Sequence, residues 1–144
     1  MAKNSSLSSV IFYSLEKAIK SYRQFAQKQL LNAGYDLTVD QWLVLKSIKD
    51  HADVTQQQIA SIVFKDYASV TRIIELLVRK NYLTRVGHPD KRRFRLVLTD
   101  EAEEVMRSIQ KVINANRRTA LRGLSTEEVT QLKKTLHKII DNCL

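Results

Sequence analysis

The chain has 144 residues, of which 44% are hydrophobic and 27% charged, and its formal net charge is +9. This length allows one domain with a real core but not two independent ones, and the composition excludes an intrinsically disordered chain. A strongly positive charge favours a polyanionic partner, nucleic acid ahead of an acidic membrane surface.

Several function classes lack their sequence signals. No apolar run approaches the roughly 18 residues of a membrane span, and residues 3–20 lack an apolar block ending in a cleavage site, so we expect a cytoplasmic protein without membrane segments. The single cysteine, Cys143, excludes an intrachain disulfide. His51, His88 and His137 lack metal-ligand spacing, and no catalytic motif occurs, so we expect no metal, no cofactor and no enzyme activity.

Three helix starts follow from one repeated local pattern. An apolar residue precedes Ser or Thr, and Gln or Glu follows three positions later, which is the arrangement of a capping box with a hydrophobic staple. The capping pairs are Thr38 with Gln41, Thr55 with Gln58, and Ser125 with Glu128.

Helical periodicity and stop signals complete the helices in chain order. We expect a long first helix from about Leu7 to Leu31, ended by Gly34, then a second from Thr38, a short third from Thr55, and a fourth from about Tyr67 to Lys80. A fifth is expected from Asp100 to about Arg122, ended by Gly123, and a sixth from Ser125.

The fourth helix has two unlike faces. Its apolar face is formed by Val70, Ile73, Ile74 and Leu77. Its outward face is formed by Ala68, Arg72, Glu75 and Arg79, flanked by Ser69 and Thr71. This helix therefore presents a polar and cationic surface to its surroundings, and Asn81 closes it in a left-handed conformation.

A β-hairpin is expected directly after this helix. Tyr82–Val86 and Phe94–Leu98 are strand-like, and the turn formers of Gly87–Asp90 lie between them. From Lys65 to Arg95 nine Lys or Arg stand against three acids, so about a fifth of the chain carries +6 of the total +9. Four of these cations, Lys91, Arg92, Arg93 and Arg95, lie near the hairpin tip.

This order of elements predicts a winged helix-turn-helix that binds DNA. Side chains near the start of the fourth helix (Ser69, Thr71, Arg72) are placed for base edges, while Lys65, Tyr67 and Lys80 are placed for the phosphate backbone. The hairpin tip is thin enough for the minor groove, where an arginine gains from focused negative potential. Asp90 either accepts hydrogen bonds within the turn or pairs with Arg92.

Other interpretations remain open. The cation cluster can be a solvated turn, and Arg72 can form a salt bridge with Glu75 or Asp66. The apolar stripes of the first, fifth and sixth helices exceed what a compact winged unit covers, which favours a dimer interface over a monomer core. Cys143 is expected to pack in the core or dimer interface rather than to act as a reactive thiol, and Trp42 to be a staple and core residue.

The residues from Leu37 to Thr99 resemble the multiple antibiotic resistance regulator (MarR) family of bacterial transcription factors. The matching segments are "LTVDQWLVL", "TQQQIA", "ASVTRIIELLVRKNYLTR" and "DKRRFRLVLT". The resemblance implies a homodimer that binds an inverted-repeat operator, and a small, often aromatic or phenolic effector bound between the dimer helices and the winged unit. The Asp90-x-Arg92 pair matches the wing motif of the family and favours Arg92 for minor-groove insertion.

We therefore expect a mostly α fold with a small β-hairpin (α+β), in one MarR-like domain over 1–144. Residues 37–99 form the winged helix-turn-helix, and 7–32 and 100–144 supply dimerisation helices. The expected function is that of a homodimeric repressor binding palindromic double-stranded DNA; the alternative is a winged module that binds protein, or nucleic acid without sequence preference. The expected DNA-binding residues are Lys65, Tyr67, Ser69, Thr71, Arg72, Arg79, Lys91, Arg92, Arg93 and Arg95, with Asp90 positioning the wing.

Overall fold

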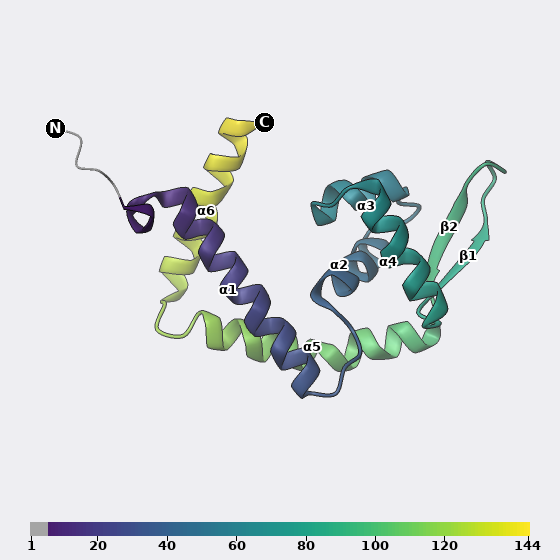
Figure 1. The fold of residues 1–144 in the computed structure, drawn as a ribbon, viewed down its shortest axis with the longest axis horizontal. Helices are drawn as coiled ribbons and strands as arrows, with labels where there is room; N and C mark the ends of the chain where they lie inside the picture. The colour runs from purple at the N-terminus through teal and green to yellow at the C-terminus, as the bar shows by residue number, and fades with distance from the viewer. Residues whose placement is uncertain (1–5) are drawn as a thin grey trace.

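The structure is a computed structural model that describes residues 6–144 (Figure 1). Residues 1–5, which fall within the single domain expected over 1–144, lie outside the described residues. The elements in chain order are η1 (Leu7–Ser9), α1 (Ile11–Asn32), α2 (Val39–Asp50), α3 (Gln56–Val63), α4 (Tyr67–Arg79), β1 (Leu83–Gly87), β2 (Phe94–Leu98), α5 (Asp100–Ala120) and α6 (Thr126–Cys143).

The expected mostly α fold with one small hairpin is confirmed. β1 and β2 pair antiparallel, with Leu83 opposite Leu98 at the base and Gly87 opposite Phe94 near the tip. Because side chains alternate along a strand, Leu83, Phe94 and Leu98 share one face of the hairpin. The hairpin stands beside α4 and projects away from α5 (Figure 1).

All three expected capping boxes are present. The Thr38 hydroxyl accepts from the Gln41 amide at 3.0 Å, and the Gln41 side chain accepts from the Thr38 amide at 3.1 Å. The same reciprocal bonds join Thr55 with Gln58 and Ser125 with Glu128. Each box satisfies two backbone donors that a helix start leaves without partners, so α2, α3 and α6 begin where local chemistry places them.

Three element boundaries differ from the prediction. The first helix does not begin at Leu7, because a 3₁₀ turn there is followed by extended Val10, and the Ser9 hydroxyl donates to the Ser6 carbonyl at 2.8 Å instead of continuing the helix. β1 begins at Leu83 rather than Tyr82, since Tyr82 closes the α4 end through its amide. α5 ends at Ala120, before the turn that Gly123 completes with φ +87°.

One core joins the winged unit to the ends of two long helices. The apolar face expected for α4 is confirmed: Val70, Ile74 and Leu77 are buried, and Ile73 is half-buried. Leu83 at the hairpin base belongs to the same buried cluster. The cluster also includes Leu30 of α1, residues of α2 and α3, and Met106, Ile109 and Ile113 of α5.

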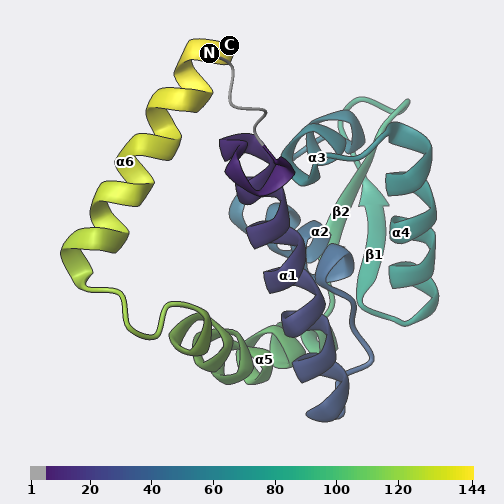
Figure 2. The same cartoon turned by 60° about the vertical axis from the view of Figure 1, so that its left-hand side comes forward.

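The N-terminal half of α1 and all of α6 lie outside this core. Ile11, Phe12 and Ile19 are exposed, and no residue of α6 is buried by the part of the chain that the structure describes. α6 stands apart from the winged unit in the turned view (Figure 2). Cys143 is exposed, so the expectation that it packs in the core of its own chain is wrong, because α6 contributes nothing to that core.

No helix in residues 6–144 combines the length and the hydropathy needed to cross a membrane.

α3 offers a matched test of the core. Ile59 is fully buried, whereas Ile62, one turn further along the same helix, is 41% exposed. We expect Ile59→Ala to lower the free energy of unfolding by about 2–5 kcal/mol, because it removes buried methyl groups and leaves a cavity. Ile62→Ala is expected to change it by about 0.5 kcal/mol or less. Urea denaturation of both variants measures the difference, and equal losses would contradict this placement of the core.

Candidate nucleic-acid interface

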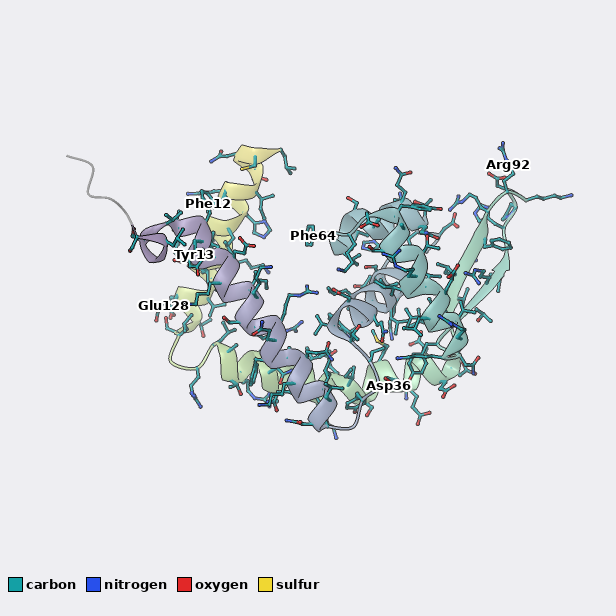
Figure 3. The ribbon with its side chains drawn as sticks, viewed as in Figure 1. Phe12, Tyr13, Asp36, Phe64, Arg92 and Glu128 are labelled. Atoms are coloured by element: carbon teal, nitrogen blue, oxygen red, sulfur yellow. The ribbon has the colours of Figure 1, made fainter. Side chains whose placement is uncertain are left out.

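The connection between α3 and α4 fixes the start of the helix expected to read DNA. Phe64 adopts a left-handed conformation with φ +60° and is 92% exposed (Figure 3). Asp66 then caps α4: its carboxylate accepts from the Ser69 amide at 2.7 Å and from the Ser69 hydroxyl at 2.9 Å. These bonds, together with the nearby Arg72 charge, lower the pKa of Asp66 below its ordinary value.

The polar side chains at the start of α4 are held in defined positions. Thr71 donates to the Tyr67 carbonyl at 3.0 Å, and its hydroxyl also accepts from the side chain of Gln56 on α3. Arg72 donates to the Ser69 hydroxyl at 3.2 Å. Within residues 6–144 no acid lies at ion-pair distance from Arg72, so the salt bridge considered for it is not formed. Its charge is available at the helix surface.

The hairpin turn is organised around Asp90. Its carboxylate accepts from the Arg92 amide at 3.1 Å and from Arg92 Nε at 3.4 Å, and its carbonyl accepts from the Arg93 amide at 2.9 Å. Both roles considered for Asp90 are therefore present. The Arg92 side chain is 91% exposed and projects from the tip (Figure 3).

Besides Arg92, which contacts Asp90, three of the cations between residues 65 and 95 are bound to acids of the protein itself. Lys65 lies 3.3 Å from the Asp40 carboxylate, which also binds Arg23 of α1. Lys80 lies 3.3 Å from the Asp36 carboxylate, and it donates to the Asp36 carbonyl at 2.9 Å. This contact ties the end of α4 to the loop before α2, and the phosphate contact expected of Lys80 stays a prediction.

Arg93 is the third of these cations, and it differs from its neighbour Arg92. It is only about one-third exposed, and it donates to the carbonyl and carboxylate of Asp53 at 3.3 and 3.4 Å. A hydrogen bond from His88, followed by the charges of Arg93 and Arg95, lowers the pKa of the Asp53 carboxyl below its ordinary value. Arg93 therefore joins the hairpin to the loop between α2 and α3.

A groove of about 380 Å³ runs between the start of α3, α4 and the hairpin. Expected residues Tyr67, Arg92 and Arg93 line it. Gln56, Gln57, Arg85 and Phe94 also line it and were not predicted as site residues. Two of these residues could have been predicted from the alternation of side chains along the strands. Arg85 pairs with Leu96, and Phe94 lies two positions before Leu96 on the same face.

Seven of the ten expected DNA-binding residues do not line this groove. Lys65, Ser69 and Arg72 line a separate pocket together with residues of α2. Arg95 pairs with Val86 on the other face of the hairpin. Arg79 is the last residue of α4, about 18 Å along the helix axis from Tyr67 at 1.5 Å per residue. Their contacts with DNA, like those of Lys91 at the exposed tip, stay predictions.

A second cavity, of about 200 Å³, lies between α1, α2 and α5. Its lining is mainly apolar and aromatic, including Tyr22 and Trp42, with Arg23, Asn116 and Arg117 as polar members. The indole N–H of Trp42 is buried and has no hydrogen-bond partner in residues 6–144. The same residues hold no cluster of three or more His, Cys, Asp or Glu side chains suited to a metal ion.

Solved structures share this fold along nearly the whole chain. A MarR/EmrR family transcriptional regulator from Acinetobacter sp. ADP1 is 18% identical with a TM-score of 0.85, covering 96% of this chain and 98% of its own. Wild-type MarR from E. coli is 24% identical with a TM-score of 0.74, covering 87% and 93%. The family model that matches residues 35–93 is that of the MarR family. The chain therefore matches the MarR family model over residues 35–93 and shares the fold of these regulators along nearly its whole length.

The segment that matches the MarR family model runs from the loop before α2 to the hairpin tip. It therefore contains both helices of the helix-turn-helix and most of the groove described above. A third similar structure is BpsR of Bordetella bronchiseptica, whose DNA binding is regulated by 6-hydroxynicotinic acid; it is 20% identical with a TM-score of 0.84, covering 95% of this chain and 97% of its own.

The cap of α4 is open to a direct test. Asp66→Ala is expected to speed hydrogen exchange at the Ser69 and Val70 amides, because α4 loses its N-terminal acceptor. Because the folded pKa of Asp66 is lowered, the stabilisation is present above the unfolded pKa and is lost as pH falls through the folded pKa. Asp66→Asn keeps one acceptor and should remove that acid sensitivity. Unchanged exchange in Asp66→Ala would refute the capping role.

Proposed function

We propose that this chain is a homodimeric repressor of transcription that binds palindromic double-stranded DNA. In this proposal the start of α4 enters the major groove, with Ser69, Thr71 and Arg72 at base edges, while the hairpin reaches the adjacent minor groove. The remaining expected contacts go to phosphates, where each neutralised charge releases counterions and steepens the salt dependence.

The observation that carries this proposal is the presentation of Arg92. Asp90 holds its backbone amide and its Nε, yet the side chain is 91% exposed at the hairpin tip. A minor-groove contact needs a thin tip and an arginine whose charged group is exposed to solvent. Arg72, which has no ion-pair partner in residues 6–144, lies on the helix beside the hairpin.

Two features support the homodimer. The N-terminal half of α1 and all of α6 leave apolar side chains exposed, among them Ile11, Phe12, Leu132 and Ile140. A twofold partner offers the same two helices, so one self-complementary surface covers both copies. Such a dimer presents two recognition helices, and a palindrome with half-sites about 34 Å apart matches that symmetry.

The cavity between α1, α2 and α5 supports a small aromatic acid as effector. Its volume equals that of about six or seven water molecules at about 30 Å³ each, which suits a single substituted ring. Trp42 supplies a donor without a partner, and Arg117 a cation. BpsR, of the same fold, responds to an aromatic acid of this size class. An effector that binds one spacing of the recognition helices more tightly shifts the population toward it.

The alternative is a winged module that binds protein, or nucleic acid without sequence preference. The two functions differ in what the tip arginine does. Sequence-specific binding requires a preferred DNA site and a loss of affinity for that site when Arg92 is removed. A protein-binding wing requires neither.

Arg92→Ala tests the DNA-binding role. DNA fragments are first selected from a random pool by the wild-type protein, and affinity for the selected palindrome is then measured by equilibrium titration. We expect Arg92→Ala to weaken binding by about 1–3 kcal/mol with the fold intact, because a minor-groove contact is lost. Arg107→Ala removes an exposed arginine of α5, outside the segment 65–95, and serves as the control.

Equal affinities for the wild type and Arg92→Ala would remove Arg92 from this role. Failure of the wild type to enrich any sequence would favour the alternative function.

The effector site has a built-in probe, since Trp42 is the only tryptophan. Titration with hydroxylated aromatic acids such as 6-hydroxynicotinic acid is expected to change its fluorescence and release the protein from DNA. Ala26 lines the cavity on α1, so Ala26→Leu should fill it and abolish both responses. Ala33→Leu, at the exposed end of α1, is the matched control. Full release in Ala26→Leu would place the effector elsewhere.

A further inference from the structure

The loop between α2 and α3 holds an aspartate in a strained conformation. Asp53 has φ +59°, which costs a non-glycine residue about 1–2 kcal/mol. No element of regular structure requires that conformation, because the α2 helix has ended at Asp50 and α3 begins only at Gln56. The conformation turns both polar groups of Asp53 toward the hairpin, where its carbonyl and carboxylate accept from Arg93.

His88 makes the second connection to Asp53. Its Nε2 lies 3.0 and 3.1 Å from the two carboxylate oxygens of Asp53, and its side chain is only 12% exposed. Its Nδ1 accepts from the Asp90 amide at 3.0 Å. Because Nδ1 is an acceptor, Nε2 carries the proton and donates to Asp53.

These bonds form a continuous chain from the α2–α3 loop to the exposed arginine. Asp53 binds His88, His88 binds the Asp90 amide, and Asp90 binds Arg92 through the carboxylate. Arg93, next to Arg92, donates a hydrogen bond directly to the Asp53 carboxylate.

The hairpin needs such an attachment because its contacts with the core do not reach its turn. Leu83 is the only buried residue of β1, no residue of β2 is buried by residues 6–144, and Leu96 and Leu98 are half-buried against the core. Five-residue strands put the turn roughly 17 Å from Leu83 at about 3.4 Å per residue, and an isolated two-stranded hairpin is marginally stable in water. The apolar contacts hold the base and the middle of the hairpin, whereas the contacts of Asp53 hold the turn.

We propose that Asp53 is a positioning residue for DNA binding, which holds the hairpin turn through His88 and Arg93 and so aims Arg92 at the minor groove. The proposal rests on the proposed DNA-binding function. Asp53 itself touches no DNA. It lowers the cost of ordering the tip at the moment of binding, which is the general benefit of preorganisation.

A charge argument alone predicts that removing Asp53 strengthens DNA binding, whereas the positioning role predicts that it weakens binding. The direction of the change in affinity therefore decides between the two. A carboxylate on a DNA-facing surface repels phosphates, so its removal should tighten binding if it has no other role. A positioning role predicts weaker binding after the same removal.

The test combines Asp53 and Arg92 variants in equilibrium titrations with the selected palindrome. Asp53→Gly removes the side chain and tolerates the positive φ, whereas alanine would add strain. We expect it to weaken binding about 3- to 10-fold, as for loss of a partly exposed charged hydrogen bond. In an Arg92→Ala background the same change should have no further effect, because the residue it positions is absent. Asp53→Asn retains one acceptor oxygen and should restore part of the affinity.

Asp50→Ala is the matched control, since it removes the same charge three residues away. Asp50 pairs with Lys46 on its own helix and, within residues 6–144, forms no hydrogen bond or ion pair with the hairpin. A direct readout comes from the nitrogen resonances of His88 in the free protein, which should lose the single Nε2–H form in Asp53→Gly while the helical circular dichroism spectrum stays unchanged.

Several outcomes would overturn the proposal. Asp53→Gly binding as tightly as the wild type, or more tightly, leaves no positioning role. The same holds for an equal loss in the presence and absence of Arg92. If the wild type selects no DNA sequence, the proposed function fails first, and the His88 resonances still report whether Asp53 orders the turn.

Discussion

The structure depends on a shared core that two dissimilar elements use together. α4 buries Val70, Ile74 and Leu77, and the hairpin buries Leu83 in the same cluster. A two-stranded hairpin does not persist in water alone, and a thirteen-residue helix is marginal, so each needs a common apolar surface. Because both are anchored there, α4 and the base of the hairpin have a fixed relation in one subunit.

The cations around this core fall into two groups: some are held by acids of the chain, and others stay exposed to solvent. Lys65, Lys80 and Arg93 bind Asp40, Asp36 and Asp53 and tie the winged unit to its loops. Arg72 has no ion-pair partner in residues 6–144, and Arg92 stays 91% exposed although Asp90 contacts its Nε. These surface pairs are individually weak, so their value lies in geometry more than in the free energy of folding. A basic segment thus contains two populations of cations that composition does not distinguish.

Local chemistry made much of the fold predictable from the sequence. The pair Thr38 and Gln41 specifies a helix start within four residues, and the spacing of Val70, Ile74 and Leu77 specifies a buried face. Asn81, with φ +63°, follows from the tolerance of asparagine for left-handed backbone. The contacts of Asp53 were not predictable from the sequence. His88 and Arg93 lie 35 and 40 residues away, and no residue pattern near Asp53 indicates that they meet it. The exposure of α6 fits the expectation that the winged unit does not cover its apolar stripe, although the stripe alone does not say which chain covers it.

The isolation of α6 has a consequence for how the protein behaves when scarce. An eighteen-residue helix that buries nothing against its own chain is held mainly by its capping box, and isolated helices of this length are marginal in water. In the proposed dimer its order comes from the second copy, so helix formation and association are one equilibrium. Below the dissociation constant the chain loses both its paired recognition helices and its last helix. In the proposed dimer, regulation therefore requires a chain concentration above the dissociation constant. Newly made chains have no regulatory effect below that concentration.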